Sequence, residues 1–221
     1  LHIPLEPLTR ASFAPFGTVI ENPARSSSST SNRNPPPHLT PRAVPANQGT
    51  ATKYLDVAHM QNHYEGARDA RGGGVGGGGG GGAPSGRPAR LSINMFACAP
   101  RALRGGSVLD VRLLERHPFT AQAFVPVGLA PGAGPTPAKY LVVVAPTVGE
   151  GGEGERREPK GRGAPDLSRV RAFLAHGRQG VTYAAGTWHA PMAVVGRETV
   201  DFVVVQWANG VSEEDCELLE L

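Results

Sequence analysis

The sequence predicts a single all-β domain over residues 1–221, an antiparallel β-barrel or jelly roll with one or two short helices and Gly/Pro-rich inserts. Short stretches rich in β-branched and aromatic residues follow one another from residue 90 onward, and Gly or Pro separates each from the next. Hydrophobic residues make up only 39% of the chain, but the deficit is local, because 11 of the 30 glycines lie within residues 72–86. The remaining sequence has the composition of one packed β core.

The N-terminal part offers two elements. Residues 1–21 fit a short helix or turn followed by a strand in FGTVIE, with Phe13 and Phe16 as core anchors. Residues 52–61, TKYLDVAHMQ, fit either a strand or a short helix, because their apolar residues follow neither period clearly.

The C-terminal part supplies most of the predicted strands. They are RLSINMFAC, VLDVRLLERH, AQAFVPV, KYLVVVAP, GVTYAAG, MAVVG and TVDFVVVQW. One helix is expected among them, over residues 165–180. Asp166 lies in its first turn, apolar residues recur at three- and four-residue spacing, and Gly177 marks its end.

Three segments are expected to be disordered inserts, at 22–48, 69–88 and 146–164. The second of them is dominated by glycine. A glycine-rich run can bind phosphates, but no G-x-x-x-x-G-K-[ST] pattern occurs here and no helix start follows the run. A flexible linker is therefore the better interpretation.

Charge and cysteine content argue against several classes of function. The net charge is only +3, and the basic residues at 156–162 are interleaved with glutamates, so no nucleic-acid partner is expected. No apolar run approaches the roughly 18 residues that a membrane-spanning helix needs. Cys98 and Cys216 have no CxxC spacing and are expected to stay free thiols, as in a soluble protein of the reducing cytoplasm.

The stretch VRLLERHPF carries the first candidate site residues. Because side chains alternate along a strand, Glu115 and His117 share one face with the apolar Leu113, and this face is expected to point inward. A buried carboxylate beside a buried imidazole needs a metal, a substrate or the other group as its partner. Gln122, after the turn at Pro118, could join them. A Glu–His pair on a sheet rim is the structural alternative.

The stretch AAGTWHAP carries the second set. Gly186 is expected in a turn, after which Thr187 and His189 share one face of a strand. Trp188 takes the other face as a packing residue, so His189 can face a cavity. The structural alternative is a histidine whose ring nitrogens form hydrogen bonds to protein groups within the core or at its rim.

These motifs together resemble a known family. ERHP, Q-A-F-x-P, G-x-x-Y and W-H-x-P, in this order, make the sequence similar to the ureidoglycolate lyase family, long called ureidoglycolate hydrolase, which has a cupin-like barrel. The resemblance runs from about Leu91 to Glu217 and extends faintly to PLTRASFAPFGTVIE. Met95 stands where bacterial members tend to have an arginine, and Ala190 replaces the second histidine of WHHP.

The resemblance implies a carbon–nitrogen lyase, of the amidine-lyase type, that splits (S)-ureidoglycolate into glyoxylate and urea in allantoin and purine breakdown. Such an elimination needs a base, an acid and positive charge beside the developing oxyanion. His117, His189 and Glu115 are the expected catalytic residues. The same three, with Gln122, are the expected ligands of a divalent metal, for which the resemblance implies nickel.

Further residues have expected roles in substrate binding. Tyr183 and Asn94 could donate hydrogen bonds to the urea group. Arg116 or Lys139 could hold the substrate carboxylate, although Arg116 lies on the opposite face of its strand from His117, where a surface or dimer-interface charge is the alternative. Asp201 could support the site or be an edge charge. A homodimer paired through a sheet edge is expected.

Three alternatives stay open at this point. An amidohydrolase would release ammonia from the same substrate, but such enzymes generally use a dinuclear site rich in His and Asp. A non-catalytic cupin would bind a small molecule without turnover, because one fold hosts both functions. A purely structural scaffold would leave ERHP and WHAP unexplained.

Overall fold

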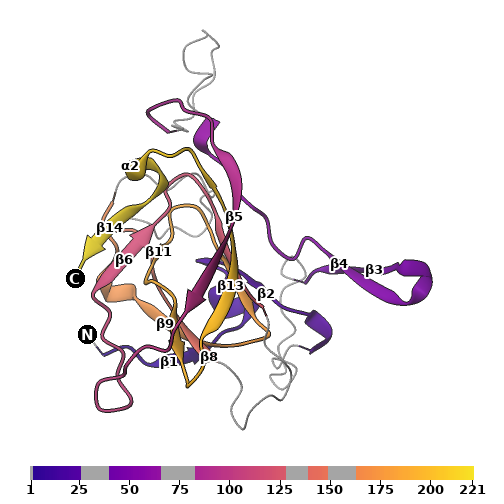
Figure 1. The fold of residues 1–221 in the computed structure, drawn as a ribbon, viewed down its shortest axis with the longest axis horizontal. Helices are drawn as coiled ribbons and strands as arrows, with labels where there is room; N and C mark the ends of the chain where they lie inside the picture. Colours follow the sequence, from indigo (N-terminus) through magenta and orange to yellow (C-terminus); the bar gives the residue numbers. More distant parts are fainter. Residues whose placement is uncertain (1, 26–39, 66–82, 128–138, 149–162) are drawn as a thin grey trace.

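The structure is a computed structural model that describes residues 2–25, 40–65, 83–127, 139–148 and 163–221. Two β-sheets face each other, and a separate two-stranded hairpin stands away from both of them (Figure 1). Two α-helices of four residues each complete the described fold, namely α1 (Arg10–Phe13) and α2 (Ser212–Asp215). The predicted all-β class with one or two short helices is confirmed, and the two facing sheets are consistent with a cupin-like fold.

The larger sheet has seven strands. Its main path is β1 (Leu5–Pro7), β9 (Arg171–His176), β8 (Lys139–Ala145), β11 (Trp188–His189), β6 (Leu113–Arg116) and β14 (Glu217–Glu220), and β12 (Ala193–Val195) also pairs with β8. Only β1 and β9 pair in parallel; the other pairs of this sheet are antiparallel. The short strand β11 lies between β8 and β6, so His189 is held in the middle of the sheet.

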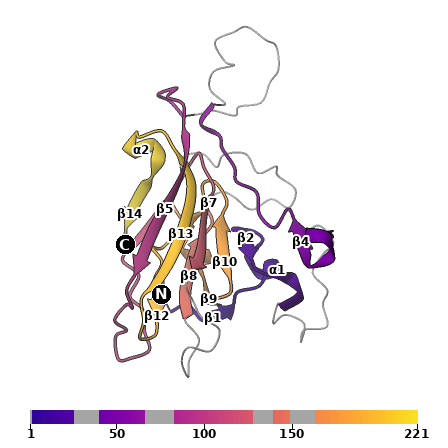
Figure 2. The same ribbon diagram turned by 45° about the vertical axis from the view of Figure 1, so that its right-hand side comes forward.

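The second sheet has five antiparallel strands. In order they are β2 (Gly17–Ile20), β10 (Gly180–Tyr183), β7 (Gln122–Val127), β13 (Val200–Ala208) and β5 (Arg90–Cys98). Strand β5 pairs with β13 over its whole length and forms one edge of the sheet (Figure 2). The remaining hairpin consists of β3 (Arg42–Ala46) and β4 (Ala51–Leu55).

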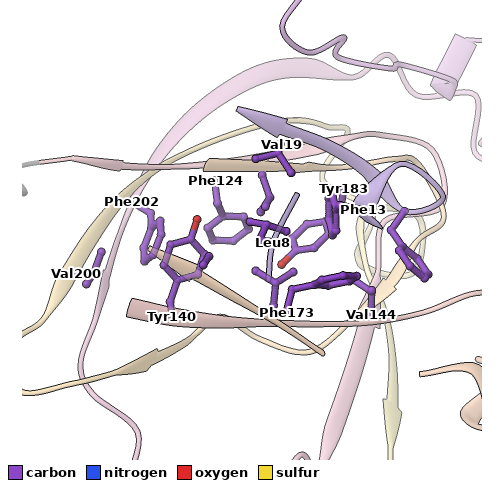
Figure 3. Packing of buried hydrophobic residues seen from close by; sticks show 14 of the residues in the cluster. Leu8, Phe13, Val19, Phe124, Tyr140, Val144, Phe173, Tyr183, Val200 and Phe202 are labelled. Atoms are coloured by element: carbon purple, nitrogen blue, oxygen red, sulfur yellow. The ribbon is translucent and has the colours of Figure 1, made fainter. Parts of the chain in front are cut away.

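The main hydrophobic core fills the space between the two sheets (Figure 3). Alternating residues of both sheets meet there, and the rings of Tyr140 and Phe202, one from each sheet, are 5.1 Å apart. Phe13 is fully buried against Phe173, and Phe16 is buried beside them, so both predicted anchors are confirmed. A second apolar cluster covers the other face of the larger sheet around Trp188.

The helix expected over residues 165–180 is wrong. The side chain of Asp166 accepts a hydrogen bond from the Ser168 backbone, but it caps only one 3-10 turn, Leu167–Arg169. The chain then continues as β9 between β1 and β8, with Ala172 and Phe173 buried on its two faces. A strand that is apolar on both faces can imitate helical spacing over six residues, and this caused the error.

Most of each predicted insert lies outside the described residues, at 26–39, 69–82 and 149–162. The described parts have defined structure. Residues 42–46 form β3, Ser85 hydrogen-bonds to the Glu214 side chain, and Thr147 forms a β-bridge with Pro165. Residues 52–55 lie in β4, so the strand alternative applies to this part of 52–61. In the described parts of the chain, no helix is long and apolar enough to cross a membrane.

Candidate active site

The structure brings Glu115, His117 and His189 together from two distant parts of the sequence. One ligand atom of each residue lies within 4.8 Å of the others, and the two imidazole ring centroids are 5.5 Å apart. His117 and His189 are buried, whereas Glu115 is partly exposed. The group therefore lies at the edge of the packed interior, where a small molecule can meet it.

Strand register explains why these residues meet. His189 of β11 is paired directly with Glu115 of β6, and directly paired residues share a face of the sheet. Gly186 turns the chain just before β11 with a φ of 78°, which glycine adopts without strain. Its backbone N–H donates to the carbonyl of His117 at 2.8 Å. Trp188 points to the opposite face and packs in the second apolar cluster, as expected.

Backbone carbonyls fix the tautomers of both histidines. Nδ1 of His117 lies 2.6 Å from the carbonyl oxygen of Asp215, and Nδ1 of His189 lies 2.9 Å from that of Thr187. A carbonyl oxygen only accepts, so each Nδ1 carries the hydrogen and each neutral ring has its lone pair on Nε2. Both Nε2 atoms are buried and accept no hydrogen bond within the described residues.

The site combines a neutral imidazole with an ionised carboxylate. Burial lowers the pKa of the His117 imidazole, and the neighbouring His189 lowers it further. Burial raises the pKa of the Glu115 carboxyl, but His189 and His117 together outweigh burial and leave this pKa below its ordinary value. The Nε2 atom of His189 is 3.5 Å from a Glu115 oxygen. The directions of these two pKa shifts thus place an ionised Glu115 carboxylate beside a neutral His117 imidazole.

This donor set fits a divalent cation. Two imidazole nitrogens and a carboxylate oxygen are ligands that nickel, manganese and zinc all accept. Each histidine also donates its other ring N–H to a carbonyl, which is the usual support of a metal-binding imidazole. The fit rests on the two buried Nε2 atoms, because a buried acceptor with no donor is costly unless a proton or a cation meets it.

Gln122 and Tyr183 adjoin this group. Gln122 is buried, its Nε2 atom donates to Oε1 of Gln206 at 2.5 Å, and its own Oε1 has no partner in the described chain. Its amide is close enough to His117 to raise the pKa of that imidazole. The Tyr183 ring stacks on His189 with centroids 4.0 Å apart, and burial keeps the pKa of its hydroxyl well above its ordinary value.

The structure does not bring Arg116, Asn94 or Lys139 to the group. Arg116 is only 2% exposed, which contradicts the alternative of a surface charge. Its guanidinium lies over the Trp188 ring at 4.6 Å and pairs with Glu217, so its role in substrate binding stays a prediction. Asn94 is exposed on β5. Lys139 lies at the opposite end of β8 from the site, because Val144 is the residue paired with His189. Asp201 is exposed on β13.

Two residues near the site were missed by sequence reasoning. Gln206 is paired with Gln122 and shares its face of β13 with Val204 and Phe202, so a polar residue at this point of an apolar face was a usable signal. Asp215 contacts His117 through its backbone carbonyl. A backbone contact leaves no trace in residue type, so no sequence signal could have identified it.

The whole chain matches known proteins. Residues 1–221 match the family model described as Ureidoglycolate lyase. A protein named ureidoglycolate lyase from Schizosaccharomyces pombe is 33% identical over 211 residues, which cover 96% of this chain and 87% of that protein. One from Burkholderia mallei is 35% identical over 201 residues, which cover 91% of this chain and 79% of that protein. One from Saccharomyces cerevisiae is 33% identical over an alignment of 224 residues, which covers 96% of this chain and 90% of that protein. The chain therefore belongs to the ureidoglycolate lyase family.

Proposed function

We propose that this protein is a lyase that cleaves (S)-ureidoglycolate to glyoxylate and urea. One observation supports the proposal most directly: a member of this family holds two buried imidazole lone pairs and an ionised carboxylate within 4.8 Å of one another. The substrate carbon bears a hydroxyl, a carboxylate and a urea nitrogen. Cleavage removes the hydroxyl proton, breaks the bond to nitrogen as the aldehyde C=O forms, and places a proton on the urea nitrogen.

His117 and His189 are the proposed ligands of a divalent cation, through Nε2, with Gln122 Oε1 or Glu115 as the third. Nickel is the ion that the family resemblance implies. A cation bound there would supply positive charge to the carboxylate and hydroxyl oxygens of the substrate. The Glu115 carboxylate alone would repel the carboxylate of the substrate.

Glu115 is the proposed proton carrier. Its carboxylate is ionised and partly exposed, so it can take the hydroxyl proton and deliver it to the urea nitrogen. Tyr183 is the proposed contact of the urea group, joined by Gln122 in the alternative in which Gln122 is not the third cation ligand. The Gln122 Oε1 atom and the Tyr183 hydroxyl both lack a partner in the described chain, and the raised pKa keeps this hydroxyl a hydrogen-bond donor.

Replacing His189 tests this function. We expect His189→Ala to lower urea production at least about a hundredfold, the usual scale for a lost metal or acid–base group. His176→Ala is the matched control, because His176 lies at the far end of β9 from the site. Production of ammonia in place of urea would identify an amidohydrolase, and binding of substrate without turnover would identify a non-catalytic cupin. Metal analysis with assays before and after chelation tests the cation site.

The assembly and location of the protein are also proposals. Strand β5 is a sheet edge that exposes large apolar side chains, which supports a homodimer paired through this edge. Cys98 and Cys216 are free thiols, as predicted, and this supports a reducing compartment such as the cytoplasm.

A further inference from the structure

The Asp215 carbonyl, which fixes the His117 tautomer, belongs to a turn that several hydrogen bonds hold in place. The Asp215 side chain accepts hydrogen bonds from the Tyr64 hydroxyl at 2.7 Å and from the backbone N–H groups of Asn209 and Gly210 at 2.8 Å each. Its own backbone N–H donates to the carbonyl of Val211. The direction of the Asp215 carbonyl is thus set by its side chain as well as by the helix α2.

The neighbouring Glu214 holds the same turn from its other side. It is only 6% exposed and accepts from the Ser85 backbone at 2.6 Å, from the Ser85 hydroxyl at 2.7 Å and from the Asn209 amide at 2.6 Å. These bonds anchor α2 without touching His117. Asp215 is therefore the residue through which the turn acts on the imidazole.

Tyr64 links this turn to the loop that follows His117. Tyr64 is 1% exposed, and its ring packs on Phe119 with centroids 5.6 Å apart. The N–H of the preceding residue, His63, donates to the carbonyl of Phe119 at 2.8 Å. Gln61 accepts from Ala121 through its carbonyl and from Ala185 through its side chain. The segment 61–64 thus contacts both loops that carry the site histidines.

We propose that Tyr64 and Asp215 are positioning residues for His117, which together hold the Asp215 carbonyl against Nδ1 so that Nε2 stays free and directed into the site. This inference rests on the proposed function only where it treats Nε2 as a cation ligand. Groups that orient a ligating histidine typically change metal affinity by about 10–100-fold when they are lost. Neither residue is assigned a contact with substrate.

The test compares two Tyr→Phe variants of the full chain. Tyr64→Phe removes the hydrogen bond to Asp215, whereas Tyr140→Phe removes a buried hydroxyl that donates to the Gln179 carbonyl, between the two sheets. Imidazole ¹⁵N NMR of the metal-free chain reports the His117 tautomer, and titration with Ni²⁺ reports the affinity of the site. Asp215→Ala and Asp215→Asn form a second pair, because Asn keeps one acceptor oxygen.

We expect Tyr64→Phe to weaken Ni²⁺ binding about fivefold, because only part of the lost hydrogen bond to the Asp215 carboxylate is passed on to His117. Tyr140→Phe should leave binding unchanged at a similar loss of thermal stability. Asp215→Ala should weaken binding about 10–100-fold and mix the His117 tautomers, with partial rescue in Asp215→Asn. If Tyr64→Phe leaves the tautomer and the affinity unchanged, or if Tyr140→Phe weakens binding as much as Tyr64→Phe does, the inference is overturned. A wild-type chain that binds no Ni²⁺ would refute the nickel site, while the tautomer measurement would still decide the inference.

Discussion

Four buried polar atoms around the site have no hydrogen-bond partner within the described part of the chain. They are Nε2 of His117, Oε1 of Gln122, the hydroxyl of Tyr183 and Nε2 of His189. Each such atom costs about 1–3 kcal/mol when it is left unpaired in the interior. The four residues are neighbours: the His117 and Tyr183 rings both lie close to the His189 ring, and Tyr183 is paired with Gln122 across two strands. Unpaired polar atoms on neighbouring residues are what the proposed ligand would satisfy.

One conservative change distinguishes whether Glu115 is the proposed proton carrier or a cation ligand. Glu115→Gln keeps an amide oxygen but removes the group that takes the proton. We expect it to lower kcat for urea release at least about a hundredfold while Ni²⁺ affinity changes much less. Steady-state assays and Ni²⁺ titration of the same preparation measure the two quantities. An equal loss of both would make Glu115 a ligand instead of the proton carrier.

Strand β6 carries Glu115, a proposed site residue, on one face and an ion pair on the other. Glu115 faces the site, while Leu114 and Arg116 are buried in contact with the second apolar cluster. The Arg116 guanidinium lies over Trp188, which directly precedes His189 in β11. Strands β6 and β11 are therefore joined through main-chain hydrogen bonds and through the side chains behind the site.

The contacts of Arg116 with Glu217 and Trp188 predict the effect of Arg116→Lys. Lysine keeps the charge but cannot pair with Glu217 through two nitrogens while stacking on Trp188. We expect the free energy of unfolding to fall by about 1.5–3 kcal/mol, the range of a hydrogen bond to a charged group. Urea denaturation measures this loss. Unchanged stability with a raised KM would instead assign Arg116 to the substrate carboxylate.

Sequence reasoning worked where one pattern determined one element. The predicted strand RLSINMFAC is β5 residue for residue, because Gly and Pro delimit the strands and β-branched residues fill them. Alternation placed Glu115 and His189 on the inner faces of their strands, and the family resemblance implied that the two motifs meet, which the register confirms. The helix prediction failed at β9, because burial on both faces of this strand removes the alternation that distinguishes a strand from a helix. Arg116 was misplaced because a second apolar cluster behind β6 was not foreseen.

At the scale of the whole molecule, β5 is the sheet edge in the described residues that exposes the most large apolar side chains. Strand β5 carries four of the large exposed apolar side chains in the described residues: Leu91 at 50%, Ile93 at 72%, Met95 at 60% and Phe96 at 45%. Its nine residues include a single charge, Arg90, so the edge lacks the charges that usually block pairing. Two copies of β5 running antiparallel about a two-fold axis would cover these side chains and pair their free backbone groups.

This arrangement predicts that Ile93→Lys dissociates the dimer. An isologous interface repeats each residue, so the variant would place two unpaired ammonium groups in the apolar centre of the contact. We expect the dissociation constant to rise at least about a hundredfold, measured by sedimentation over a range of protein concentrations, because burying like charges costs several kcal/mol. Leu218→Lys is the matched control, since Leu218 is 62% exposed on β14, the edge strand of the other sheet. A dimer that persists in Ile93→Lys but dissociates in Leu218→Lys would show that the interface is at β14. A monomeric wild-type chain would refute the dimer.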